Sequence, residues 1–215
     1  MEGSIDYGFV STTYTSKDFK DDVFKCLIKK FSTGISRGNK SLKITGNSYR
    51  NPIDVVPCLR YRDYSGDFKN DQGNYVPGIA FNSEDGELII NFPEQHIKNG
   101  RLKNGETNYY YKKVVRIFKK VKSLMTESGI SGVDNISSFA IESLLWNIPS
   151  DSYVTHFRND RLGSLVQDCL KFLNEVSFVE FKEANGIKKL CETSQDEKQL
   201  KQFVFQMIQF IVYKE

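Results

Sequence analysis

The chain begins with a helical pattern of apolar and polar positions. Between Ser16 and Phe31, the apolar residues Phe19, Val23 and Leu27 recur every fourth residue, while Lys and Asp fill most of the other positions. This period predicts an amphipathic helix over residues 16–31, with Ser16 as its N-terminal cap.

Residues 41–92 follow a different pattern, made of short alternating or β-branched runs. These runs predict strands at residues 41–45, 52–61, 78–81 and 87–92. Turn-forming residues separate several of them, including Gly46-Asn47 and Glu84-Asp85-Gly86.

After residue 105 the pattern becomes helical again and remains so to the end of the chain. Helices are predicted at residues 107–125, 138–146, 160–175 and 195–213. Strands followed by helices are typical of an α+β fold. We therefore expect a domain with a sheet and one helix over residues 1–105 and a helical domain over residues 106–215.

The composition excludes several classes of protein. The 215 residues include 16 Phe and 11 Tyr, which supply a core and exclude general disorder. No run approaches the roughly 20 apolar residues of a membrane span, and the first residues lack the pattern of a secretion signal. Neither a Walker loop nor a Gly-x-Ser-x-Gly elbow is present, which argues against P-loop and α/β-hydrolase chemistry.

The charge and the cysteines add two expectations. The net charge of +3 is too small to indicate a nucleic-acid coat unless the positive charge is concentrated in one place. The four cysteines are far apart and form no Cys-x-x-Cys pair, and two histidines are too few for a zinc cage. We expect reduced, mostly buried thiols in a cytoplasmic protein.

Asp54 is the most informative single residue, because aspartate is disfavoured in strands and its neighbours are apolar. A carboxylate there is costly unless it lies at a sheet edge, pairs with a cation or binds a metal. The pattern alone leaves an ion pair with a nearby Lys or Arg and a functional role equally open.

The predicted helix at residues 107–125 carries a positive face. Six cations and no acid lie between residues 112 and 122, namely Lys112, Lys113, Arg116, Lys119, Lys120 and Lys122. Four of them, at positions 112, 116, 119 and 120, are spaced by three or four residues or are adjacent and form a connected face. Such a face is either a solvated surface or a binding site for triphosphate or nucleic-acid phosphates.

Three further features have both a structural and a functional interpretation. Ser137 and Ser138 open an apolar helix, where they either cap it or offer a hydroxyl and backbone N–H groups to an anion. His96 is either a structural hydrogen-bonding residue or a catalyst. The tyrosines at positions 109–111 point in different directions on a helix, so one can stack a base while at least one belongs to the core.

Six segments carry a resemblance to a known family. They are Tyr14-Thr15-Ser16-Lys17-Asp18-Phe19-Lys20, Arg37-Gly38-Asn39-Lys40-Ser41, Ile53-Asp54-Val55-Val56-Pro57, Asn91-Phe92-Pro93-Glu94-Gln95-His96, Lys113-Val114-Val115-Arg116-Ile117-Phe118-Lys119 and Ser137-Ser138-Phe139-Ala140-Ile141-Glu142. In this order, the chain resembles bacterial relatives of the cyclic GMP-AMP synthase and oligoadenylate synthase nucleotidyltransferases, which make cyclic oligonucleotide signals against phage.

The resemblance implies a fold, ligands and site residues. It implies a polymerase-β-like sheet with three metal-binding carboxylates, packed on a C-terminal helical bundle, with Mg²⁺ and ATP or GTP as ligands. It places Asp54 at the third carboxylate, as the catalytic and metal-binding residue. It places Lys119 and Ser138 at the donor triphosphate. Arg116 of the cationic face and Lys40, in a segment near the acceptor, complete the candidate triphosphate-binding residues.

The sequence also departs from the family pattern. The family's Gly-Ser turn is followed some ten residues later by an Asp-x-Asp strand, whereas Gly3-Ser4 is followed at once by Asp6 without a second aspartate beside it. We therefore expect two metal ligands to be absent, with the family's N-terminal part truncated and a weak or incomplete Mg²⁺ site. Such a chain is expected to bind nucleoside triphosphates rather than polymerise them.

Two other functions remain open from the sequence. The chain could act as a non-catalytic nucleotide- or RNA-binding regulatory partner of an active enzyme. Alternatively, the chain could be an interaction module whose basic helix contacts a partner protein. None of these functions involves a membrane.

Overall fold

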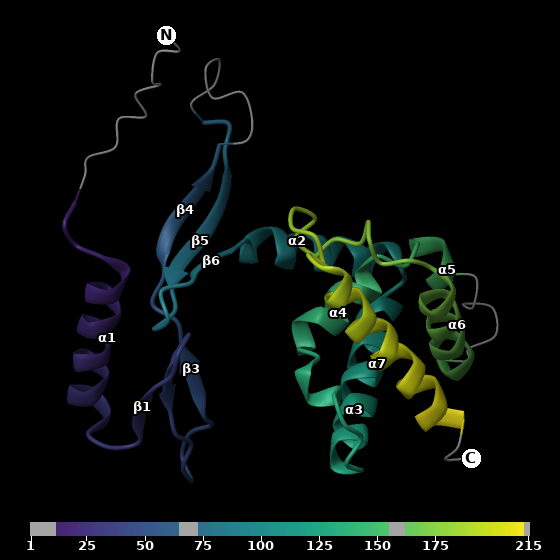
Figure 1. Cartoon of the computed structure of the whole chain (residues 1–215), viewed down its shortest axis with the longest axis horizontal. Helices are drawn as coiled ribbons and strands as arrows, with labels where there is room; N and C mark the ends of the chain where they lie inside the picture. Colours follow the sequence, from purple (N-terminus) through teal and green to yellow (C-terminus); the bar gives the residue numbers. More distant parts are fainter. Residues whose placement is uncertain (1–11, 65–72, 155–161, 213–215) are drawn as a thin grey trace. The chain divides into compact units, whose positions relative to one another are not determined.

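The computed structural model describes residues 12–64, 73–154 and 162–212, and the chain divides into two compact units, Met1–Asn91 and Phe92–Glu215 (Figure 1). The first unit contains a helix and six strands, and the second contains only helices among its described residues. The α+β fold with a C-terminal helical region is therefore confirmed. The predicted boundary after residue 105 lies near the end of helix α2, whereas the compact units divide just before that helix.

Helix α1, Ser16–Phe31, has the predicted bounds but a different cap. Thr15 has an extended backbone and accepts a hydrogen bond from the backbone N–H of Asp18 at 3.2 Å, while Asp18 accepts one from the backbone N–H of Thr15 at 2.8 Å. This reciprocal pair is a capping box. The prediction of Ser16 as cap was wrong, because Ser16 is already helical and its hydroxyl donates to Asn82 at 2.8 Å.

The strands form two separate three-stranded antiparallel sheets. The first has the order β1-β2-β3 and the second the order β4-β5-β6. Their bounds are Ile35–Arg37 for β1, Leu42–Ile44 for β2, Ile53–Val55 for β3, Leu59–Asp63 for β4, Val76–Asn82 for β5 and Leu88–Asn91 for β6. In the first sheet Leu42 pairs with Val55 and Ile44 with Ile53, and Leu42 and Ile44 are buried.

The predicted strand at residues 52–61 is two strands in two sheets, so that prediction was wrong. Pro57 lies between β3 and β4. Its ring fixes φ and removes the backbone N–H, so the hydrogen-bond ladder cannot continue through it. The other predicted strands are confirmed with shifts at their ends, and β1 was missed because a three-residue strand leaves almost no pattern.

A cluster of ion pairs ties α1 to both sheets. The buried ammonium of Lys20 lies 2.6 Å from Glu84 and donates to the carbonyl of Asn39 at 3.0 Å. Arg37 also donates to Glu84, at 2.7 Å. These two cations hold the pKa of Glu84 at about 2. The loop that carries Lys40 is therefore anchored at its start.

The second unit is built from six α-helices and one 3₁₀ turn among its described residues. Their bounds are Pro93–Glu106 for α2, Tyr110–Glu127 for α3, Val133–Asn135 for η1, Ser138–Trp146 for α4, Ser150–Val154 for α5, Leu162–Glu175 for α6 and Ser194–Val212 for α7. The four predicted helices correspond to α3, α4, α6 and α7. Helix α2 was not predicted.

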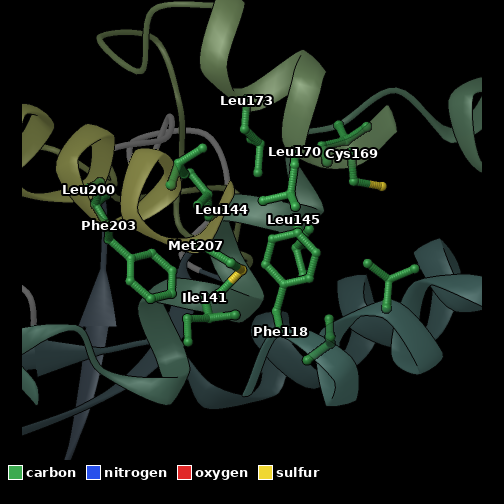
Figure 2. Packing of buried hydrophobic residues seen from close by; sticks show 14 of the residues in the cluster. Phe118, Ile141, Leu144, Leu145, Cys169, Leu170, Leu173, Leu200, Phe203 and Met207 are labelled. Atoms are coloured by element: carbon green, nitrogen blue, oxygen red, sulfur yellow. The ribbon is translucent and has the colours of Figure 1, made fainter. Parts of the chain in front are cut away.

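Side chains from α3, α4, α6 and α7 fill one apolar core (Figure 2). Phe118, Leu145 and Met207 are each fully buried there. Burying a side chain of this size contributes about 1.5–3 kcal/mol. The core therefore fixes α3 and α4 rigidly against each other.

All four cysteines are unpaired in the structure. Cys169 and Cys191 are buried, and burial raises the pKa of the Cys169 thiol to about 12. Cys26 is exposed, contrary to the expectation of mostly buried thiols. No helix within residues 12–64, 73–154 and 162–212 is both long and apolar enough to cross a membrane.

Candidate functional site

The apolar stripe of α3 determines where its cations point. Val114, Val115 and Phe118 are buried in the core, so the opposite face of the helix is directed away from it. The cations Lys112, Lys113, Arg116 and Lys120 are exposed, and Lys119 is half-buried at the edge of this face. Arg116 lies one turn before Lys119, and its Nε donates to the carbonyl of Lys112 at 3.2 Å.

Lys119 is bound to a carboxylate of α4. Its Nζ lies 3.0 Å from Oε2 of Glu142. Glu142 is four residues after Ser138, and side chains at this spacing share a face and lean toward the N-terminus of the helix. The ion pair therefore places the Lys119 ammonium beside the first turn of α4.

The start of α4 combines a cap with free anion-binding capacity. Ser137 is the N-cap, and its Oγ accepts a hydrogen bond from the backbone N–H of Ala140 at 3.0 Å. The capping interpretation is therefore confirmed for Ser137. Ser138 is the first helical residue and is exposed. The first N–H groups of a helix have no partner within it, so an anion can still bind at Ser138.

His96, which belongs to α2, forms a cluster with Lys119 and Glu142. Its Nε2 lies 3.5 Å from Oε1 of Glu142, and its ring stacks on Phe139 with 4.9 Å between the ring centroids. Its Nδ1 is buried and has no hydrogen-bond partner among the described residues. The structure thus gives His96 a structural partner in Glu142, and its catalytic interpretation stays a prediction.

The electrostatics of this cluster centre on Glu142. The bond from His96 and the one from Lys119 hold the pKa of Glu142 at about 2, although partial burial opposes this shift. The carboxylate is therefore ionised at neutral pH. Without a bound anion, Glu142 is the counterion of Lys119.

Tyr111 and Tyr109 differ in burial, as expected from their positions in the sequence. Tyr111 is fully buried, and its hydroxyl donates to the backbone carbonyl of Glu142 at 2.9 Å. It therefore belongs to the core and fixes α4 against α3. Tyr109 is 68% exposed and precedes α3 with a positive φ of 65°, so its ring remains accessible to a ligand.

Asp54 lies in β3, at the edge of the first sheet, and is exposed. Its Oδ1 accepts a hydrogen bond from Ser41 at 3.3 Å. Lys43 is its partner in the strand register, but the ion pairs found in the described part of the chain do not include Asp54. The edge position thus explains how the strand accommodates a carboxylate.

The neighbours of Asp54 bear on its predicted role as a metal ligand. Within residues 12–64, 73–154 and 162–212, no three His, Cys, Asp or Glu side chains are grouped as a metal site requires. Asp54 provides one oxygen ligand, which does not fit a two-metal site by itself.

The structure brings some of the predicted residues together. Lys119 of α3 pairs with Glu142, one turn after Ser138 on α4, and Arg116 lies one turn before Lys119 on α3. Asp54 and Lys40 belong to the first unit, where Lys40 is exposed with its Nζ 3.6 Å from Glu87.

Glu142 lies in a family-like segment, but no sequence pattern indicated a role for it. The one available signal was its spacing of four residues from Ser138, which puts both on one face of α4.

Comparison with known proteins identifies the family. The model of the cGAS/DncV-like nucleotidyltransferase C-terminal helical domain matches residues 98–212, which includes α3, α4 and the whole cluster except His96. The chain belongs to the cGAS/DncV-like nucleotidyltransferase family. This confirms the resemblance inferred from the sequence motifs.

Relatives of the chain include cyclic nucleotide synthases. The chain is 41% identical over 210 residues to the cyclic GMP-AMP synthase CdnE03 of Staphylococcus schleiferi, which covers 96% of this chain and 64% of that protein. It is 39% identical over 211 residues to the cyclic nucleotide synthase CdnE01 of Staphylococcus haemolyticus, covering 94% and 68% respectively. The chain thus spans about two thirds of the length of these relatives.

Solved structures of CdnE synthases are similar to this chain. The CdnE c-UMP-AMP synthase of Rhodothermus marinus, solved with Apcpp and Upnpp, has a TM-score of 0.83 and 28% identity, covering 95% of this chain and 69% of that one. The CdnE cyclic dinucleotide synthase of Elizabethkingia meningoseptica, solved with GTP and Apcpp, has a TM-score of 0.81 and 27% identity, covering 95% and 74%.

Proposed function

We propose that this chain binds the triphosphate group of a nucleoside triphosphate, ATP or GTP, at Lys119 and Ser138. The observation that carries the proposal is the ion pair of Lys119 with Glu142, which lies one helical turn after Ser138 on α4. A cation next to the free N–H groups of a helix start is a favourable arrangement for phosphate.

The chain's own residues would bind the phosphates by three contributions. Lys119 would form a charge-assisted hydrogen bond with a phosphate oxygen. The Ser138 hydroxyl and the N–H groups at the start of α4 would donate to a second oxygen. Arg116, one turn from Lys119, adds positive charge at the edge of the site.

We infer further that the chain binds nucleotide without synthesising an oligonucleotide. No Asp-x-Asp sequence occurs in its 215 residues, so Asp54 is the only carboxylate that the family pattern assigns to the metals. Mg²⁺ would reach the site chiefly with the nucleotide. A role in defence against phage is part of this proposal, in keeping with the motifs shared with the family.

The proposal is tested by isothermal titration of ATP and GTP into the wild-type chain and into Lys119→Ala. We expect the substitution to weaken binding by about 1–3 kcal/mol, the contribution of a charge-assisted contact. Lys171→Ala is the matched control, because Lys171 is an exposed lysine on α6. This variant should bind ATP and GTP as tightly as the wild type. Equal affinities in all three proteins would refute the site.

A second candidate function is nucleic-acid or partner-protein binding by the cationic face of α3. It is favoured by the exposure of Lys112, Lys113, Arg116 and Lys120 on that face. Phosphate backbones bound there would show strong salt dependence. A steep loss of RNA binding on adding salt, together with a smaller slope in Lys112→Ala, would support it, and salt-independent binding would count against it.

A further inference from the structure

We propose that Glu142 is the positioning residue of the triphosphate site, which holds Lys119 in place before the ligand arrives and is itself supported by His96. This inference rests on the proposed function, because it concerns the residue that prepares the same cation.

The first support for the inference is the geometry of the ion pair. One oxygen of Glu142 lies 3.0 Å from Nζ of Lys119, and the exposed fractions of the two side chains are 23% and 32%. A free lysine side chain samples many rotamers and loses them on binding a ligand. A lysine already bound to a partly buried carboxylate loses much less freedom, which is the advantage of preorganisation.

The second support is that Glu142 is fixed from two other helices. Its other oxygen lies 3.5 Å from Nε2 of His96, whose ring is stacked on Phe139. Its backbone carbonyl accepts the hydroxyl of the fully buried Tyr111 at 2.9 Å. A carboxylate held in this way by α2 and α3 can define the position of Lys119 precisely enough to matter for a ligand.

If Glu142 acted only through its charge, its removal would have the opposite effect on phosphate binding. Its negative charge lies 3.0 Å from the Lys119 ammonium and would therefore be near any phosphate bound there, so a carboxylate acting only as a counterion would repel the ligand. Removing such a counterion strengthens anion binding. Removing a positioning residue weakens anion binding in spite of the lost repulsion, because Lys119 becomes free to leave the site. The sign of the change therefore separates the two roles.

The experiment is an ATP titration of Glu142→Ala, Glu142→Gln and the double variant Lys119→Ala/Glu142→Ala, beside the wild type and Lys119→Ala. We expect Glu142→Ala to weaken ATP binding about 5- to 20-fold, in the range of site-to-site couplings. Glu142→Gln, which keeps an oxygen for Lys119 and has nearly the same shape, should lose less. In the Lys119→Ala background, the second substitution should cause no further loss.

The outcomes distinguish this inference from the proposed function. Unchanged or tighter binding in Glu142→Ala would overturn the positioning role and leave the triphosphate site in place. An equal loss with and without Lys119 would show that Glu142 acts only on the fold, and thermal melts of both glutamate variants check the fold directly. ATP affinity that is absent in the wild type, or unaffected by Lys119→Ala, would instead overturn the proposed function, and this inference with it.

Discussion

Burial decides how much the close partners of a charged side chain contribute to stability. Lys119 and Glu142 form a half-buried pair, in which little water competes for the charges. Asp54 accepts one hydrogen bond from Ser41 at an exposed sheet edge, where the net contribution to stability is small.

The exposure of Asp54 predicts that folding does not depend on its charge. We expect Asp54→Asn to change Tm by no more than about 2 °C, because the asparagine oxygen can still accept from Ser41. Glu84→Gln is the matched control, since it removes the carboxylate that balances the buried Lys20, and it should lower Tm clearly. A thermal melt in which Asp54→Asn loses more than about 8 °C would show that Asp54 is a structural ion-pair partner.

At the residue scale, the sequence predicted the cation and the helix start but not the residue that joins them. Lys119 and Ser138 were found because charge spacing and N-terminal serines are visible in a single segment. Glu142 contacts Lys119 across 23 positions of the chain, and a glutamate in a helix is ordinary in itself. Contacts of this kind depend on how two helices pack, which a one-dimensional pattern does not contain.

Three helices meet at the carboxylate of Glu142. Lys119 approaches it from α3 and His96 from α2, while Glu142 itself belongs to α4. Both contacts stabilise the ionised form, which is why its pKa is about 2 instead of the ordinary 4.5. The cluster therefore couples the packing of these helices to pH.

Acid should weaken the helical unit through this group. A carboxyl whose pKa is lowered by folding stabilises the folded state fully above its ordinary pKa, and that contribution is lost as the pH falls toward about 2. We expect the free energy of unfolding to fall by about 2 kcal/mol more in the wild type than in Glu142→Gln between pH 6 and pH 2.5. Urea unfolding at both pH values measures this, and parallel losses in the two proteins would contradict it.

At the element scale, helices with a clear apolar period were predictable, and elements without a clear pattern were not. Helix α4 has the predicted bounds, Ser138–Trp146, because its cap and its apolar residues agree. Helix α2 was missed because Gly100 and Gly105 lie within it and its apolar positions form no clear stripe. The strand at residues 52–61 was predicted too long because its β-branched residues outweighed Pro57.

For the whole molecule, the candidate residues are divided between the two units. The helical unit holds Lys119 and Ser138, and the first unit holds Asp54 and Lys40. Among the relatives, the cyclic GMP-AMP synthase CdnE03 is longer, and this chain spans 64% of it. The order of strands and helices was enough to predict the α+β class, but the division into two sheets required the three-dimensional structure.

We expect this 215-residue chain to make no oligonucleotide. Two-metal phosphoryl transfer needs several carboxylates to hold the metals, and Asp54 supplies one. The purified chain is incubated with the four labelled nucleoside triphosphates and Mg²⁺ or Mn²⁺, and the products are separated by chromatography. A metal-dependent cyclic or linear product that disappears in Asp54→Asn would contradict this expectation.

The central claim is that Lys119 and the start of α4 bind the triphosphate. Its most direct test is a crystal structure of the chain soaked with a non-hydrolysable nucleoside triphosphate and Mg²⁺. We predict phosphate density within hydrogen-bonding distance of the Lys119 ammonium and of the Ser138 hydroxyl or the first N–H groups of α4. A fully occupied nucleotide whose phosphates lie elsewhere, with the Lys119–Glu142 pair unchanged, would contradict the claim.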